Sequence, residues 1–142
     1  MATRNTLTTD VWDSVYTYLQ TTNAITTNNI FSAFNDTLVK NKGYPLVIIY
    51  PPEVDFIPED IQGEMTSSST SMLIEVYDDN SQDTKAMRDE VTSKLLAGRS
   101  TFRTAKLYKM KIENSGYDTW QEGGKKIHRL ALMVEFTYRG KA

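Results

Sequence analysis

The chain of 142 residues contains no cysteine and a single histidine, His128. Without cysteine, disulfides, iron–sulfur clusters, zinc fingers and thiol nucleophiles are excluded. Long apolar runs are also missing. The longest, such as Leu46 to Tyr50, are far shorter than the about 20 residues that a transmembrane helix needs. Residues 1–6 carry one charge with no apolar stretch behind it, so we expect no secretory signal.

The composition is that of an ordinary globular domain. Hydrophobic residues make up 39% and charged residues 24% of the chain, which are typical values. A chain of this length buries roughly 68% of the surface that its unfolded form exposes, so it can form a real core. Neither an internal repeat nor a linker divides the sequence. We therefore expect a single domain over residues 1–142.

Charge is segregated along the chain, although the net charge is only −2. Residues 43–84 carry nine acids and no lysine or arginine, whereas residues 85–142 carry thirteen bases and six acids. This polarity favours contact between copies, acidic surface against basic surface. The alternative is that the two regions pair within the monomer or are only solvated.

Apolar residues recur at helical spacing in three segments: 10–20, 28–39 and 82–97. The second segment is short, and its helix is the weakest of the three predictions. The third segment has the clearest boundaries. Asn80 or Ser81 can cap its start, and Gly98 is expected to stop it.

Four segments have the composition or alternation of strands: 46–50, 72–77, 102–113 and 127–138. Alternation in the third places Tyr108, Met110 and Ile112 on one face. Residues 114–126 contain three glycines and predict a long hairpin connection. Residues 53–71 are first acidic and then rich in serine and threonine, as in a long surface loop or a polar strand. Together these elements predict an α+β fold, with a four-stranded, mainly antiparallel sheet packed against two helices.

Groups suited to catalysis or metal binding are scarce. His128 alternates with leucines on its strand, which favours a structural role over a catalytic triad. Asp78, Asn80 and Gln82 have the spacing of a calcium loop, but Asp83 replaces the expected glycine, and helix capping explains them better. The acids at 59, 60 and 64 are better read as a solvated loop than as acid–base catalysts. We expect no catalytic residue, no metal and no cofactor; a small carboxylate-dependent hydrolase is the least favoured class.

The second half of the chain carries a run of bases: Arg99, Arg103, Lys106, Lys109, Lys111, Lys125, Lys126 and Arg129. With Tyr108 and Trp120 they could serve nucleic acid. The pI of about 5.4 argues against that use, so contact with the acidic 53–64 region of another subunit is favoured. Tyr117 and Trp120 lie in the glycine-punctuated connection. They either pack back on the domain or anchor a partner.

The order of these features is similar to that of a known family. Gly43 to Pro52 follows an N-terminal helix, and Met72 to Tyr77 leads through Asp78-Asp79-Asn80 into an amphipathic helix. A long two-stranded unit then ends in Phe136 to Arg139. In order and length, nearly the whole chain resembles the tail-terminator (tail-completion) proteins of long-tailed bacteriophages and the related head–tail joining proteins. The resemblance includes no sharp motif.

The resemblance implies structural work in a virion, and no enzyme activity. Such proteins form a six-membered ring on the finished tail tube, stop its growth and offer a docking surface to the neck. The implied partners are further copies of the chain, the tail tube protein and a head-completion or neck protein, with no membrane. DNA would pass through the ring without specific binding. The implied location is the head–tail junction of the virion, after assembly in the host cytoplasm.

Candidate contacts with ring neighbours or partners follow from the charges and aromatics: Glu59, Asp60, Glu64, Arg99, Arg103, Lys106, Lys109, Tyr117 and Trp120. The acidic segment could instead line the lumen, where like charge would keep DNA from sticking. The alternative functions are a head-completion or neck protein and, more distantly, a nucleic-acid-binding α+β module.

Overall fold

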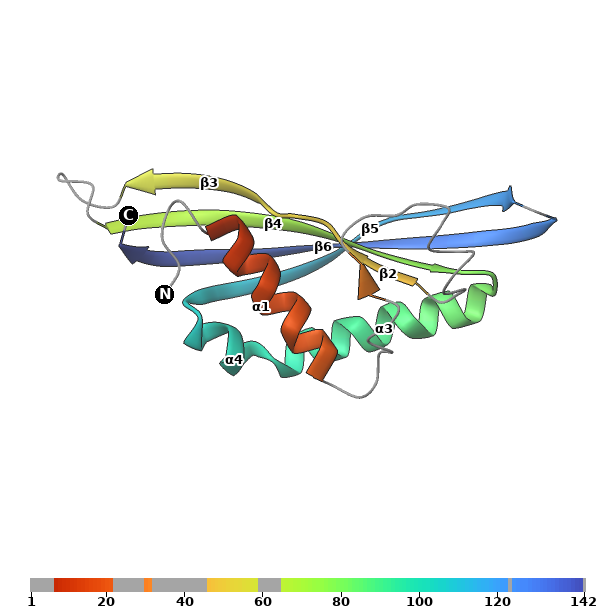
Figure 1. Cartoon of the computed structure of the whole chain (residues 1–142), viewed down its shortest axis with the longest axis horizontal. Coiled ribbons are helices and arrows are strands. Elements are labelled where there is room, and N and C mark those ends of the chain that lie inside the picture. Colours follow the sequence, from red (N-terminus) through yellow and green to blue (C-terminus); the bar gives the residue numbers. More distant parts are fainter. Residues whose placement is uncertain (1–6, 22–29, 32–45, 59–64, 123, 142) are drawn as a thin grey trace.

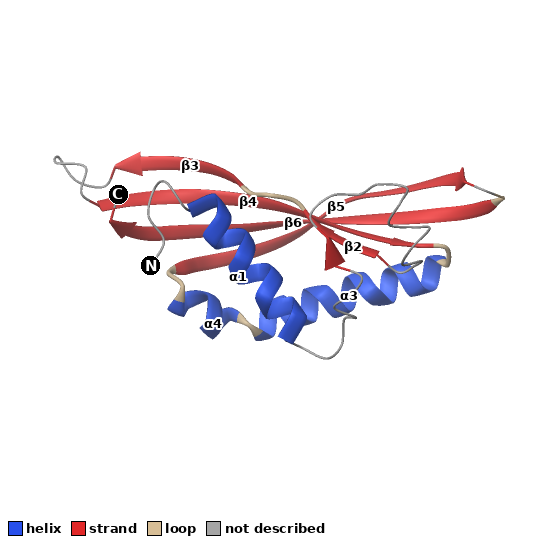
Figure 2. Ribbon diagram, viewed as in Figure 1, coloured by secondary structure: helices blue, strands red, loops and turns tan. Residues whose placement is uncertain are grey.

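In the part of the chain that the structure describes, three helices cover one face of a long, mainly antiparallel sheet (Figure 1, Figure 2). The computed structural model describes residues 7–21, 30–31, 46–58, 65–122 and 124–141. The helices are α1 (Leu7–Thr21), α3 (Ser81–Ala97) and α4 (Arg99–Thr104). The strands are β1 (Ile30–Phe31), β2 (Leu46–Ile49), β3 (Glu53–Pro58), β4 (Met65–Asp78), β5 (Leu107–Glu122) and β6 (Lys125–Lys141). No described helix has the length and apolar character needed to cross a membrane.

The long strand β4 organises the sheet. Its whole length pairs with β6, and β5 follows β6 at one edge. On its other side β4 pairs with β2 and, further along, with β3, and β1 adds to β2 in parallel. All pairs except β1 with β2 are antiparallel. The predicted α+β class and mainly antiparallel sheet are confirmed, and the described residues add β1, β3 and α4 to the predicted elements.

Several predicted boundaries are wrong. Ile30–Phe31 is a strand that pairs with β2, not part of a helix, and the rest of 28–39 lies outside the described residues. Residues 102–104 end α4 and do not start a strand. Residues 114–126 are mainly paired strand, because β5 runs to Glu122 and β6 begins at Lys125. The described part of 53–71 is neither one loop nor one strand but two paired strands, β3 and the first half of β4, and residues 59–64 lie outside the described residues.

The core lies between the helices and the face of the sheet formed by alternate residues of β4 and β6. On β6 these residues are His128, Leu130, Leu132, Val134, Phe136 and Tyr138, all buried as the alternation predicts. Helix α1 contributes Val11, Val15 and Leu19 to the same core. The indole Nε1 of Trp12 donates a hydrogen bond to the carbonyl of Ile49 at 2.6 Å, which fixes α1 to β2.

Helix α3 begins and ends where the sequence predicts. The side-chain oxygen of Asn80 accepts hydrogen bonds from the backbone N–H groups of Gln82 and Asp83, at 2.9 and 3.1 Å. This cap satisfies N–H groups that have no partner within the helix. It confirms the capping interpretation of the calcium-like spacing. At the other end, the N–H of Gly98 donates to the carbonyls of Lys94 and Leu95.

Candidate functional site at the corner of α4 and β5

Gly98 joins α3 to α4 in a crowded place. A Cβ atom on this residue would lie 2.6 Å from Cζ of Tyr18, a separation that real Cβ atoms essentially never show. Directly after this turn, α4 directs Phe102 into the core. The Phe102 ring makes edge-to-face contacts with Tyr18 and Phe136, with centroids 5.2 and 5.3 Å apart. This anchoring leaves Arg99 and Arg103, one helical turn apart, exposed.

The chain then enters β5 through two lysines with unusual backbones. Lys106 has φ 66° and Lys109 has φ 54°, and no other described non-glycine residue has positive φ. The left-handed region is costly for any residue with a Cβ atom. Both strained residues therefore lie at the corner that also carries the two arginines.

Lys109 belongs to a β-bulge. Tyr108 pairs with Thr137 and Lys111 pairs with Glu135, so two residues of β5 oppose one residue of β6. The extra residue reverses the alternation, and Leu107, Met110 and Ile112 pack against the core. Tyr108 instead stays 36% exposed. The prediction that Tyr108 shares a face with Met110 and Ile112 is therefore wrong.

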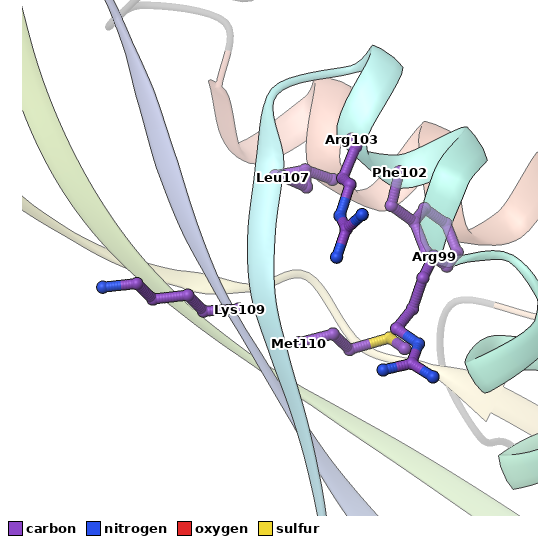
Figure 3. A pocket seen from close by; sticks show the side chains of 6 residues that line it. All are labelled: Arg99, Phe102, Arg103, Leu107, Lys109 and Met110. Atoms are coloured by element: carbon purple, nitrogen blue, oxygen red, sulfur yellow. The ribbon is translucent and has the colours of Figure 1, made fainter.

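A shallow pocket of about 100 Å³ lies at this corner (Figure 3). It is lined by Arg99, Phe102, Arg103, Leu107, Lys109 and Met110. Phe102 and Leu107 are buried, so they form an apolar floor. Figure 3 shows the guanidinium groups of Arg99 and Arg103 extending from α4 toward Met110, whereas the ammonium group of Lys109 points to the other side of β5.

The cations of this pocket have no acidic partner within the described ranges. Arg99 donates through Nε to the backbone carbonyl of Leu96, at 3.4 Å. The ion pairs among described residues involve neither Arg99, Arg103 nor Lys109. The pocket therefore presents two guanidinium groups above an apolar floor, an arrangement suited to a carboxylate or a phosphate.

The structure brings together only some of the predicted contact residues. Arg99, Arg103 and Lys109 line one pocket, and Lys106 lies in the turn between α4 and β5. Tyr117 and Trp120 lie further along β5, where Trp120 pairs with Ile127 of β6. Glu59, Asp60 and Glu64 lie outside the described residues.

Tyr117 packs on its own domain but is still 47% exposed. Its hydroxyl lies 2.6 Å from Nδ1 of His128, and the two rings are stacked with centroids 6.0 Å apart. His128 is 8% exposed. His128, the single histidine of the chain, thus contacts a residue of the neighbouring strand β5, as expected for a structural role.

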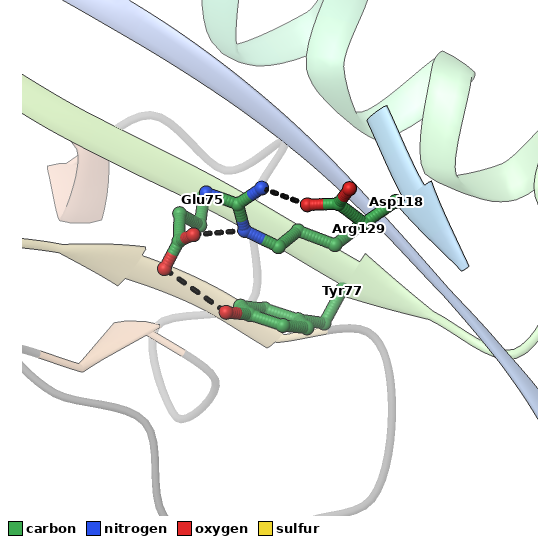
Figure 4. A network of polar contacts seen from close by, with 4 residues as sticks. All are labelled: Glu75, Tyr77, Asp118 and Arg129. Carbon is green, nitrogen blue, oxygen red and sulfur yellow. Dashed lines mark hydrogen bonds and ion pairs between the residues drawn. The ribbon is translucent and has the colours of Figure 1, made fainter. Parts of the chain in front are cut away.

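A buried ion-pair network lies on the face of the sheet opposite the helices (Figure 4). Glu75, 4% exposed, is ion-paired with Nε of Arg129 and accepts a hydrogen bond from the Tyr77 hydroxyl at 2.9 Å. Nη1 of Arg129 also contacts Asp118 of β5 at 2.7 Å. Burial and the neighbouring Glu75 raise the pKa of Tyr50 to about 12 and also raise the pKa of Tyr77.

Sequence reasoning missed this network and assigned Arg129 to the basic run. The available signal was Glu75, an acid within the apolar strand Met72 to Tyr77. A carboxylate is almost never fully buried without a partner. A search for the base that neutralises Glu75 would have included Arg129 among its candidates.

The turn before α3 gathers acids without forming a metal centre. Burial, together with the neighbouring Asp79 carboxylate, raises the pKa of Asp78 to about 6. Asp79 is 3.7 Å from Nζ of Lys125. Within the described part of the chain, no group of three or more histidine, aspartate or glutamate residues could hold a metal ion.

Comparisons with known proteins show similarity only at the level of the fold. No protein-family model matches the chain, and no curated protein matches it in sequence. Among solved structures, a chain from the virion of the native gene transfer agent (GTA) particle has a similar fold, with a TM-score of 0.57 and 12% sequence identity. The match covers 93% of this chain and 95% of that chain. At this identity the comparison establishes a shared architecture over nearly the full length of both chains.

Proposed function

We propose that this chain is a virion structural protein, a tail terminator that forms a ring on the end of the tail tube. The observation that carries the proposal is the end-to-end correspondence of its fold with a chain of the gene transfer agent virion. A fold does not define a function by itself. The order of elements in the sequence, which resembles tail-terminator proteins, supports the same assignment independently of the solved structure.

In this role the protein stops growth of the tube and provides the docking surface for the neck. Its partners are other copies of itself, the tail tube protein and a head-completion or neck protein. The predicted contact residues at the α4–β5 corner face outward, where a neighbouring subunit can reach them. A ring with repeated head-to-tail contacts suits a chain whose charges are segregated.

The distribution of bases disfavours the nucleic-acid-binding alternative. Three members of the basic run are paired with acids in the same chain: Lys111 with Glu113, Lys125 with Asp79, and Arg129 with Glu75 and Asp118. These pairs interrupt the continuous cationic surface that strand-tracking proteins use.

Electron microscopy of particles assembled without the protein tests the proposal. The gene would be disrupted in its parent genome, and a plasmid copy would restore it as the control. We expect overlong or ragged tails beside full heads, because nothing would end tube growth. Tails of normal length that fail to join heads would place the protein in the neck instead. Intact, infectious particles would contradict any essential structural role.

A further inference from the structure

We propose that the pocket between α4 and β5 is a carboxylate socket that receives the acidic segment 53–64 of a neighbouring copy of this chain. The inference rests on the proposed ring and names the contact that closes it. The segment carries Glu53, Asp55, Glu59, Asp60 and Glu64 and no lysine or arginine.

The first support is the unmatched charge of the socket. Arg99 and Arg103 extend toward the same hollow, and no described acid pairs with either. Other described bases with a partner pair with acids of the same chain, as Arg129 does with two carboxylates and Lys125 with Asp79. Two planar guanidinium groups match the geometry of carboxylates, with paired N–H donors directed at the two oxygens.

The second support is the apolar floor of the socket. Phe102 and Leu107 are buried beneath the arginines, and Met110 is partly buried against the same core. A carboxylate on an aliphatic stem can place its methylene groups on such a floor. A phosphodiester has no comparable apolar stem, so the floor favours a protein segment over a nucleic-acid backbone.

The third support is the strained backbone of Lys106 and Lys109, both at positive φ. Such residues persist when surrounding structure holds them, and they cluster at functional sites. Here the strain accompanies a bulge that turns Met110 toward the core and Lys109 away from it. The bulge thereby shapes the lining of the socket.

The geometry of the sheet determines which copy can supply the acids. Strand β3, which begins the acidic segment, and strand β5, which carries the basic corner, lie on opposite sides of the β4–β6 pair. One row across the sheet joins them, from Asp55 through Ser69 and Thr137 to Tyr108. Three strand spacings of about 4.8 Å separate the backbones at the ends of this row.

For Asp55 this separation disfavours contact with the basic corner of the same copy and suits contact between two copies. An acidic edge and a basic edge on opposite sides of one sheet make a heterologous, head-to-tail contact, in which each subunit uses both edges once. Such contacts generate a ring when the rotation between subunits closes. The acidic strand β3 and the basic strand β5 are thus separated across the sheet as well as along the sequence.

A charge swap between two copies tests the socket. The gene-disrupted parent is complemented with Arg99→Glu/Arg103→Glu, with Glu59→Lys/Asp60→Lys, or with both variants together. Each variant alone places like charges in every contact. Like charges placed opposite each other weaken the affinity of an interface about 100-fold or more. We therefore expect each variant alone to lower the titre of infectious particles by a similar factor. Together they can alternate around an even-numbered ring with opposite charges in every contact, and the titre should recover.

The rescue is also the control for folding, because a variant that cannot fold cannot be rescued by its counterpart. If Arg99→Glu/Arg103→Glu complements as well as wild type while disruption still gives overlong tails, the socket is wrong and the terminator function stands. If disruption has no effect on particles, the proposed function fails. In that case the two charge-swapped variants are purified, mixed at high concentration and chemically cross-linked. Absence of cross-links between them in the mixture overturns the socket.

Nucleic acid is the remaining occupant to test. Linear double-stranded DNA is titrated against wild type and Arg99→Glu/Arg103→Glu. Loss of DNA binding in the variant, with no rescue by Glu59→Lys/Asp60→Lys, would assign the corner to phosphates and overturn the carboxylate socket. Equal, negligible DNA binding by both proteins together with rescue in the mixture supports it.

Discussion

Asp78 is a carboxyl group whose ionisation the fold makes unfavourable. It lies at the end of β4, buried at 6% exposure, with its Oδ1 accepting a hydrogen bond from the Asp79 N–H at 2.7 Å. Burial disfavours the charged form, and Asp79 and Asp83 add negative charge nearby; together they outweigh the Asp79 N–H, which favours the charged form. The pKa of Asp78 is therefore raised to about 6 in the folded protein.

The raised pKa predicts a pH dependence of stability. Between the ordinary aspartate pKa of about 4 and pH 6, the folded state holds a proton that the unfolded state has lost. The free energy of unfolding should fall as pH rises through this window and then level off. Asp78→Asn keeps the oxygen acceptor and removes the proton, so the fall should become smaller. Urea unfolding at a series of pH values measures it.

Asp13→Asn provides the matched control, because Asp13 is an exposed aspartate on α1. Its pH profile should follow that of wild type. Parallel profiles for Asp78→Asn and wild type would contradict the assignment of this pH dependence to Asp78.

At the scale of elements, the Glu75–Arg129–Asp118 network joins three neighbouring strands. Glu75 belongs to β4, Arg129 to β6 and Asp118 to β5. Beyond this point β4 ends opposite His128, and β5 and β6 continue as a two-stranded hairpin. An isolated two-stranded hairpin is marginal in water, so this network and the Tyr117–His128 contact hold the base of the hairpin from both faces of the sheet.

Breaking one side of the buried pair should cost more than removing both. Arg129→Met leaves Glu75 buried without its cation, and we expect a loss of about 3 kcal/mol in the free energy of unfolding. In Glu75→Met/Arg129→Met no buried charge is left unpaired, so much of that loss should be recovered. Chemical denaturation of the three proteins measures the difference. A double variant as unstable as Arg129→Met would show that the network stabilises by more than charge neutralisation.

At the scale of the whole molecule, segregated charge should make copies attract one another at low salt. Coulomb attraction between acidic and basic edges is screened within about 10 Å at 0.1 M salt and about 3 Å at 1 M. We expect a negative second virial coefficient at low ionic strength that rises with added salt, measured by static light scattering. Arg99→Glu/Arg103→Glu should remove this dependence. A wild-type coefficient that does not change with salt would contradict attraction between oppositely charged edges.

The candidate site was partly predictable because its parts are local in the sequence. Arg99 and Arg103 are one helical turn apart, and Lys106 and Lys109 follow within a few residues. Only a turn after Gly98 is needed to bring these four residues to one corner. The floor beneath them was not predictable, because its shape depends on a bulge opposite Phe136, far along the chain.

The sequence by itself determined the features that depend on neighbours in the chain. These include the alternation along β6, the Asn80 cap, the stop at Gly98 and the separation of acidic from basic residues. The tertiary structure alone decided which side of β5 faces the core, which base neutralises Glu75, and that the acidic and basic strands occupy opposite sides of the β4–β6 pair. The physical reason is that strand register and burial are set by partners distant in the chain, whose identity no local pattern encodes.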